Sequence, residues 1–493
     1  MQDVSAIRVL DAAKALAFIG DLSMGQPTDH SPRTGWLAAR LAAEAGLDDA
    51  QCDAVKEVSL LRWSGCTANA AGFSDWLGDD VGARAAMLAM RPNWSGREES
   101  PAQFGAAITP LAQIHCEVSG EVAHMLGLAD TTQEALRRIF ESWDGGGFPD
   151  QRAGRDVPAA VFIVAVAGDL EILSRVYGLE GAQALIAQKA GRQYPKEIAQ
   201  LACARAATWL KELDALPAQP HDDPLSTQAL QLVSRPEIVA DVIDLKLPWM
   251  TGYSRRVAET AAACCARLGT GDEVRRTTYT AALLHGMGRM AVPNTIWNTA
   301  GELTRAAWEK VRLVPYWTAR AGQQIEGLAR ESEIASFAYE RLDGSGYFRN
   351  SAGAAIGREA RILAVAAAWT ALRSDRPWRA AFSAERAAAL LDEAAQTGRF
   401  DAEVVKATVG AELDEPAGSI DRARSPKSGL LSPREAEVLK HISLGASNKE
   451  VARILDLSPS TVRTHVESVF RKLECSTRAA ATLKASALGY LGA

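Results

Sequence analysis

The chain has little of the material from which disulfide-stapled or sheet-based folds are built. It contains 493 residues but only seven cysteines, none of them in a CxxC spacing, and aromatic residues make up 6%. An odd number of scattered thiols favours reduced cysteines in a cytoplasm over a disulfide framework. Alternating Val, Ile and Thr runs of the strand type are also scarce, so the sequence predicts few β-strands.

Membrane-directed segments are missing as well. The N-terminal stretch MQDVSAIRVLDAAKALAFIG has neither the basic flank nor the cleavage site of a signal peptide, and no apolar run reaches membrane-spanning length. The longest apolar run, Val157 to Gly168, is better interpreted as a buried helix. We therefore expect a cytoplasmic protein without a membrane partner.

Ala-rich and Leu-rich segments at helical spacing dominate the sequence, and 47% of the residues are hydrophobic. This pattern predicts an all-α protein of two or three domains. Two polar stretches rich in Pro interrupt the helical patterns at 214–226 and 412–429, and both are interpreted as linkers. The expected parts are therefore 1–213, 227–411 and 430–493, two helical modules followed by a small helix-turn-helix bundle.

The segment 430–493 is punctuated as a set of short helices. Capping boxes open helices at Ser432 and Ser447, and Ser458 precedes a Pro at the first helical position. After Ser458 the apolar residues share one stripe: Val462, Val466, Val469, Phe470 and Leu473. The opposite face is polar and offers donors and an acceptor for base edges and phosphates, as a recognition helix in the major groove requires.

This segment resembles the DNA-binding domain of the LuxR/FixJ class of bacterial response regulators, on the motifs LSPRE, NKEVAR, SPSTVRTH and RKL. The resemblance implies double-stranded DNA as the partner, inverted half-sites and a homodimer. Its implied base contacts are Arg463, Thr464 and Glu467, its phosphate contacts are Lys449, Thr461, His465 and Lys472, and Ser460 and Arg471 complete the polar face. The alternative is that these residues only form the solvated side of a small bundle.

The last helix of the segment follows Arg478. It places Leu483, Ala487 and Tyr490 near one face, which the resemblance implies is the dimerising face. Packing of this face within the domain is the alternative.

Charge supports a division of labour. Residues 421–493 hold 12 Lys and Arg against 7 Asp and Glu, a net charge of +5, so the chain's net charge of −6 leaves −11 on residues 1–420. The acidic part would repel nucleic acid. We therefore expect DNA binding through the basic C-terminal segment alone, with an affinity that falls as salt rises.

The rest of the chain contains an internal repeat. The segment WDGGGFPDQRAGRDVPAAVFIVAVA from Trp143 matches LDGSGYFRNSAGAAIGREARILAVA from Leu342 without a gap, 199 residues later. A tandem duplication explains this match better than chance. Glycines beside Asp144 and Asp343 predict a tight loop that each aspartate caps, followed by a buried helix that begins near Val157 or Ile356.

Each copy resembles the HD-GYP subgroup of the HD phosphohydrolases. In the second copy the similarity runs through AALLHGMGRMAVP, ERLDGSGY, RILAVAAAWTALRSDRPWR and FDAEVV; the first copy carries DHSPRTGWLAARLA, IHCEVSGEVA and ESWDGGGFPD. The resemblance implies an all-helical enzyme that holds two or three metal ions and cleaves cyclic dinucleotides. Such chemistry needs a ring of imidazoles and carboxylates around the metals.

Most of those ligands are replaced. At the family's ligand and loop positions the second copy has Tyr253, His285-Gly286, Arg289, Val314, Ala338-Tyr339 and Ala367, and the first copy has Arg62-Trp63, Ile139-Phe140 and Gly168. Only His30, His115 and His285 remain as residual ligand positions, and we interpret them as hydrogen-bonded core histidines. The sequence therefore predicts no catalytic residues, no metal site and no cofactor. A single weak metal shared between the copies is the alternative.

The expected function is a DNA-binding transcriptional regulator with a catalytically inactive HD-GYP-like sensory or dimerisation region. Aromatic residues at former ligand positions, Trp63, Tyr253 and Tyr339, either line a pocket for a small molecule or nucleotide or fill the old cavity. No phosphoacceptor receiver domain is recognisable. Two alternatives stay open: a metal-dependent cyclic-dinucleotide phosphodiesterase carrying a DNA-binding tail, and an interaction scaffold.

Overall fold

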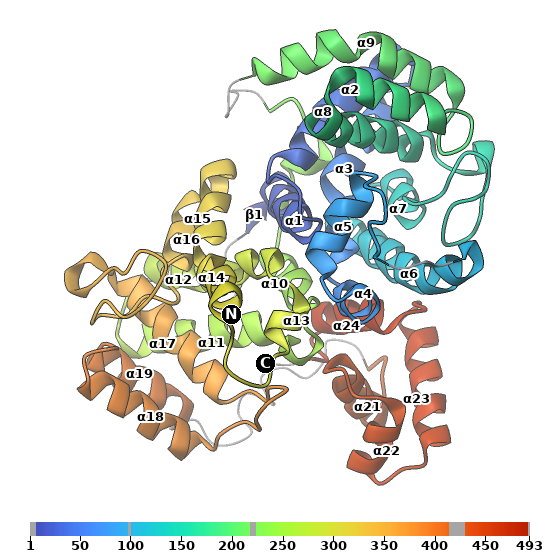
Figure 1. Cartoon of the computed structure of the whole chain (residues 1–493). Coiled ribbons are helices and arrows are strands. Elements are labelled where there is room, and N and C mark those ends of the chain that lie inside the picture. The colour runs from blue at the N-terminus through green and yellow to red at the C-terminus, as the bar shows by residue number, and fades with distance from the viewer. Residues whose placement is uncertain (1–5, 97–99, 217–222, 414–428, 492–493) are drawn as a thin grey trace. The chain divides into compact units, whose positions relative to one another are not determined.

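The computed structural model describes residues 6–96, 100–216, 223–413 and 429–491 (Figure 1). Within these ranges the chain is almost entirely helical, which confirms the all-α class. The strands named there are one short antiparallel pair, β1 (Ile7–Arg8) and β2 (Val233–Ser234). None of the helices in the described part combines the length and the apolar character that a bilayer crossing needs.

The chain divides into two compact units, and the first runs from Ile7 to Ser234. We call this unit the first module. Its helices are α1 (Val9–Ser23), α2 (His30–Glu44), α3 (Asp49–Leu61), α4 (Ala70–Leu77), α5 (Asp80–Leu88), α6 (Pro101–Met125), α7 (Asp130–Arg137), α8 (Ala159–Lys189) and α9 (Lys196–Asp214), with short 3-10 turns at Ser64–Cys66, Gly154–Asp156 and Ala229–Gln231.

The core of the first module is built around the first half of α8. This half begins at Ala159, close to the start predicted at Val157, and Val161, Val164 and Leu170 are at most 1% exposed. A helix that is apolar on all sides must be surrounded by other helices, and α2, α3 and α9 pack along it. Gly178 has a φ of 72° and interrupts the helix beyond the buried half.

The first module extends past the expected boundary at residue 213. Leu225 and Leu230 are buried, and the Thr227 hydroxyl donates to the Glu57 carboxylate at 2.8 Å. Residues up to Ser234 therefore belong to this module, because they close its core and because β2 pairs with β1.

The second unit starts at Arg235, and its helices up to residue 413 are called the second module. They are α10 (Glu237–Asp244), α11 (Tyr253–Arg267), α12 (Asp272–Leu284), α13 (Asn294–Trp297), α14 (Arg305–Arg312), α15 (Val314–Gln324), α16 (Ala329–Ala335), α17 (Arg358–Leu372), α18 (Ala384–Gln396) and α19 (Ala402–Leu413), with 3-10 turns at Pro248–Met250, Met287–Ala291, Glu326–Leu328 and Gly353–Ala355.

The matching segments of the two modules fold into the same loop. Glu141 and Glu340 each accept hydrogen bonds from the backbone amides nine and eleven residues further on, at 2.7 and 3.0 Å in both modules. Asp144 and Asp343 each accept from the amide two residues on, at 2.9 Å, which confirms that they cap the loop. The buried helix after the second loop begins at Arg358, two residues beyond the prediction.

Four short helices form the C-terminal bundle: α21 (Pro433–Ser443), α22 (Asn448–Leu455), α23 (Pro459–Lys472) and α24 (Arg478–Leu488), drawn in red in Figure 1. Ser432 and Ser447 form the predicted capping boxes, and the Ser458 side chain accepts from the Thr461 amide. Asp456 ends α22 with a left-handed φ of 53° and makes the tight turn to α23. The bundle has a core of its own, formed by residues between Leu431 and Leu491.

Candidate functional site

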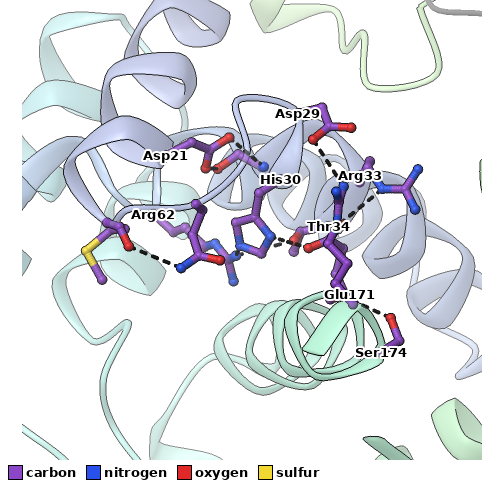
Figure 2. A network of polar contacts seen from close by, with 12 residues as sticks. Asp21, Asp29, His30, Arg33, Thr34, Arg62, Glu171 and Ser174 are labelled. Carbon is purple, nitrogen blue, oxygen red and sulfur yellow. Dashed lines mark hydrogen bonds and ion pairs between the residues drawn. The ribbon is translucent and has the colours of Figure 1, made fainter. Parts of the chain in front are cut away.

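At the centre of the first module an arginine lies against a histidine. His30 opens α2, Arg62 follows α3, and Glu171 lies in α8 (Figure 2). His30 Nδ1 is 2.5 Å from a Glu171 carboxylate oxygen, and the Arg62 guanidinium contacts His30 Nε2 on the other side of the ring. The His30 side chain is fully buried.

The protonation of His30 follows from its surroundings. Burial, aided by the positive charge of Arg62, lowers the pKa of His30 to about 4, so the imidazole is neutral near pH 7. Its Nδ1–H then donates to Glu171, and its Nε2 lone pair accepts an N–H of Arg62. A metal ion would need that same lone pair, so the guanidinium occupies the coordinating position of His30.

The absence of a side chain at Gly168 leaves room for the Arg62 guanidinium. A Cβ at this position would lie 2.1 Å from Arg62 Nη1, so a side chain here is incompatible with the present arginine conformation. Gly168 stands where the resemblance places a metal-binding aspartate. Arg62 also donates to the Thr34 hydroxyl at 3.3 Å and to the Val164 carbonyl at 3.4 Å. An aspartate at position 168 and the present conformation of Arg62 therefore exclude each other.

Two buried carboxyl groups adjoin this centre. Asp21 accepts from the Ser31 amide at 2.9 Å and from its hydroxyl at 2.6 Å, yet burial raises the pKa of Asp21 to about 8. For Glu171 burial acts in the same direction, but hydrogen bonds from His30 and Arg175 outweigh it and lower its pKa to about 2. Glu171 was not predicted from the sequence, although an acidic residue three positions after the apolar run Val157 to Gly168, within the same helix, was a usable signal.

His115 lies beside the centre, but its ring nitrogens contact other groups than those of His30 do. Its Nε2 donates to the Arg62 carbonyl at 2.7 Å, and its Nδ1 is 3.5 Å from the Cys66 sulfur. Burial lowers the pKa of His115 to about 3, so this ring is also neutral. Its ring nitrogens thus face protein groups, as expected of a hydrogen-bonded core histidine.

The second module repeats the arginine–histidine contact with different residues. His285 ends α12, its Nδ1–H donates to the Ala282 carbonyl at 2.5 Å, and Arg289 donates to its Nε2 at 2.7 Å. Burial and then the Arg289 charge lower the pKa of His285 to about 3. Here too the guanidinium takes the lone pair that a metal would use.

Tyrosines surround His285 at two former ligand positions. The Tyr253 hydroxyl donates to the Ala367 carbonyl at 3.0 Å, and Arg289 donates to the Tyr339 hydroxyl at 3.1 Å. Tyr339 in turn stacks on Tyr347 with ring centroids 5.3 Å apart. In this module the aromatic residues pack around the histidine, and Tyr253 is only 4% exposed.

The carboxyl group beside this centre follows the pattern of the first module. Asp244 accepts from the Ser254 amide and hydroxyl, both at 2.7 Å, as Asp21 does from Ser31. Burial raises the pKa of Asp244 to about 6.

The two arginines come from different sequence positions. Arg62 stands where the resemblance places the histidine of the His-Asp pair, whereas Arg289 stands where it places a lysine. Across the described ranges no group of three or more His, Cys, Asp or Glu side chains is arranged to hold a metal ion. The residues present therefore do not fit a di-metal centre, because two imidazoles are engaged by cations and the other ligands are absent.

The second candidate site is the polar face of α23. Arg463 and Glu467 are 76% and 62% exposed and pair with each other at 2.8 Å. Thr464 is exposed and its hydroxyl donates to the Ser460 carbonyl at 3.2 Å, while Lys449 is exposed on α22. These residues are free to meet a duplex.

Several other predicted contacts touch neighbours within the bundle, although Thr461 and Arg471 are exposed. Lys472 donates to the Glu435 carboxylate at 2.7 Å, and the Glu435 side chain is only 7% exposed. Thr461 lies 2.8 Å from the Ser458 hydroxyl, Arg471 contacts Ser468 at 3.4 Å, and His465 is half-buried. The resemblance implied a phosphate contact for Lys472, whereas the structure shows it joining α23 to Glu435 of α21.

The dimerising face predicted on α24 is divided. Leu483 is buried, Ala487 is exposed, and Tyr490 packs partly on the bundle core, where its hydroxyl accepts from the Leu431 amide at 3.1 Å. Packing within the domain thus accounts for Tyr490.

Comparison with known proteins separates two parts of the chain. Residues 237–404 match the family model of the HD domain, and residues 429–485 match that of the bacterial regulatory proteins of the luxR family. The chain carries an HD domain and a LuxR-type DNA-binding domain. The HD domain falls within the second module, and the LuxR-type domain is the C-terminal bundle.

Relatives of the HD part are phosphodiesterases. A 3'3'-cGAMP-specific phosphodiesterase 3 of Vibrio cholerae serotype O1 is 25% identical over 407 residues, which cover 76% of this chain and 88% of the relative. A cyclic di-GMP phosphodiesterase of Pseudomonas aeruginosa is 31% identical over 46% of this chain and 54% of its own length. The crystal structure of a Vibrio cholerae cyclic GMP-AMP-specific phosphodiesterase has the same fold, with a TM-score of 0.60 and 23% identity over 84% of this chain and 99% of that one.

Relatives of the LuxR-type domain are regulators. A probable transcriptional regulatory protein NarL of Mycobacterium tuberculosis is 45% identical over 69 residues, which are 14% of this chain and 32% of the relative.

Proposed function

We propose that the protein is a DNA-binding transcriptional regulator in which two tandem HD-GYP-like modules have lost metal chemistry and serve as a sensory or dimerising body. One observation carries this proposal. In each module a buried guanidinium occupies the Nε2 lone pair of a surviving histidine, Arg62 on His30 and Arg289 on His285. A metal ion could bind these histidines only if the guanidinium left, because both need the same lone pair.

The exchange lowers the positive charge that the centre holds. A divalent metal needs several anionic ligands, whereas a guanidinium carries one positive charge and five N–H donors. Around Arg62 the carboxylates of Asp169 and Glu171 offset part of that charge. Burial lowers the pKa of Arg62 to about 10, so the arginine keeps its charge at neutral pH.

DNA binding is assigned to the LuxR-type domain. The segment that contains this domain, residues 421–493, is positively charged, whereas residues 1–420 are negatively charged. In addition, α23 has exposed donors on the face opposite its buried stripe. The homodimer and the inverted half-sites expected for such domains belong to the same proposal.

The DNA-binding part is tested on the full chain. Duplexes selected from a random pool are used in gel shifts at two salt concentrations, with the variants Arg463→Ala and Lys449→Ala and with Arg386→Ala, an exposed cation on α18, as the matched control. Loss of Arg463 should reduce discrimination at one base position by roughly ten-fold or more, because a side chain on a base edge reads sequence.

Loss of Lys449 should weaken binding to all duplexes alike and flatten the salt dependence by about one unit, because a phosphate contact carries no sequence information. Failure to enrich any duplex at low salt would overturn the assignment of DNA binding. Equal losses for Arg463→Ala and Arg386→Ala would remove α23 as the recognition helix.

A cyclic-dinucleotide phosphodiesterase is the second candidate, because relatives of the HD part bear that activity in their names. Turnover of 3'3'-cGAMP or cyclic di-GMP by the purified chain, in the presence of iron or manganese, would establish it. The arginine contacts predict no turnover.

A further inference from the structure

We infer that the first module binds a small aromatic carboxylate in a cavity beside Arg62. The cavity has a volume of about 260 Å³ and lies within this module alone. A ligand bound there would be an input signal for the proposed regulator. This inference rests on the proposed function in one respect, namely that the centre holds an arginine and no metal ions.

The walls of the cavity are apolar and aromatic. The residues that line them include Met24, Phe73, Leu88, Ile108, Phe140 and Phe148. Ligand sites in proteins usually combine such walls with a few polar groups. A volume of about 260 Å³ is slightly below the range of about 300–1,000 Å³ that is usual for ligand pockets, so the occupant is one ring system and not a cyclic dinucleotide.

Two consecutive residues of the lining, Arg62 and Trp63, each carry a donor without a partner in the described part of the chain. Arg62 Nε–H and Trp63 Nε1–H are buried, and neither finds an acceptor among the described residues. Arg62 is 4% exposed and Trp63 is 6% exposed, and both residues line the cavity. Buried donors without acceptors are costly, and a carboxylate brings two acceptor oxygens.

The charge of Arg62 selects an anion over a neutral acceptor. Its hydrogen bonds go to His30, the Thr34 hydroxyl and the Val164 carbonyl, which are all neutral. The carboxylate of Asp169 also lines the cavity, but Lys189 binds it at 2.8 Å. A buried cation whose direct acceptors are neutral gains most from a bound anion.

A substitution in the lining can fill the cavity. Ala165 of α8 lines it and is only partly buried, so a leucine at this position should fill part of the cavity. Ala184 lies on the same helix and is exposed, and Ala184→Leu provides the matched control.

The test measures thermal unfolding and calorimetric binding of the full chain without DNA. The probes are indole-3-acetate, phenylacetate and benzoate, with indole-3-acetamide as the uncharged counterpart. At a 100-fold excess over Kd at least one of the acids should raise Tm by roughly 3 °C or more, and the amide should bind at least about ten-fold more weakly. Ala165→Leu should abolish the shift and Ala184→Leu should retain it.

Arg62→Met is the second variant and should remove the preference for acid over amide. If it fails to fold, Ala165→Leu still decides the matter. Absence of a shift with all three acids, or an equal shift in wild type and Ala165→Leu, would overturn the inference. Either result leaves the gel shifts and the metal content unchanged, so the failure of the ligand site is distinguishable from the failure of the proposed regulator.

Discussion

At the scale of single residues, the arginine–histidine contacts explain replacements that look unrelated in the sequence. Arg62 needs the space at Gly168, and Tyr253 uses its hydroxyl to bond the backbone of Ala367. Gly168 and Ala367 both stand where the resemblance places an aspartate. Gly168 thus leaves space for a buried guanidinium, and the backbone carbonyl of Ala367 provides the acceptor that the buried Tyr253 hydroxyl needs.

Gly168→Ala should destabilise the first module. The new Cβ would collide with the Arg62 guanidinium, and overpacking of this kind costs about 1–3 kcal/mol. Urea denaturation at pH 7 measures the change. Gly105→Ala in α6 is the matched control, since nothing lies within 4 Å of its Cβ position, and it should be neutral or slightly stabilising. Equal stability of Gly168→Ala and Gly105→Ala would show that Arg62 does not hold this position.

The stability of the chain should depend on pH through its buried histidines. The pKa of His285 is about 3 in the folded protein and about 6.5 in the unfolded chain. Between these values the unfolded chain binds a proton that the folded one does not, so the contribution is complete above pH 6.5 and is lost as the pH falls towards 3.

His285→Gln tests this relation. The glutamine keeps an acceptor for Arg289 but does not titrate, so the fall in unfolding free energy between pH 6.5 and 4.5 should become shallower by about 1.4 kcal/mol per pH unit. Denaturation curves at several pH values give the slope. An unchanged slope would mean that the imidazole is charged in the folded protein.

At the scale of elements, local signals in the sequence predicted local structure well. The capping serines of α21, α22 and α23 and the turn before α23 lie where the residue pattern placed them, because caps and turns depend on residues within four positions of each other. The repeated glycine loop was likewise predictable, since Asp144 and Asp343 bond amides only two residues away.

Contacts between distant segments were beyond such reasoning. Glu171 meets His30 from 141 positions away, and Thr227 meets Glu57 from 170 positions away. The contact of Glu171 with His30 fixes the arrangement of side chains at the centre of the first module. The contact of Thr227 with Glu57 shows that this module extends beyond residue 213. Both pairs consist of buried polar side chains whose partners are set by packing, which a residue pattern does not encode.

Within the bundle, Lys472→Ala should loosen the attachment of α23 to α21. Lys472 is a partner of the nearly buried Glu435 carboxylate, which would keep only its bonds from Ser432 and Ser468. Hydrogen exchange of α21 amides in the full chain should become faster, whereas Arg471→Ala, one position earlier and exposed, should leave it unchanged. Identical exchange rates in both variants would show that the ion pair of Lys472 with Glu435 does not hold α23 to α21.

At the scale of the whole molecule, two chemically distinct parts share one chain. Residues 421–493 carry a net charge of +5 and the preceding residues carry −11. The positive charge lies in the segment that contains the LuxR-type domain, and a polyanion is attracted to that segment. The proposed DNA contacts and the buried arginine–histidine contacts therefore belong to different segments of the sequence.

The metal content of the full chain tests this account most directly. The protein is purified from cells supplied with iron and manganese, dialysed against metal-free buffer, and analysed by inductively coupled plasma mass spectrometry. The arginine contacts at His30 and His285 predict transition metal well below one ion per chain. One or more tightly bound iron or manganese ions per chain would contradict the account, because a metal at either histidine requires the guanidinium to leave.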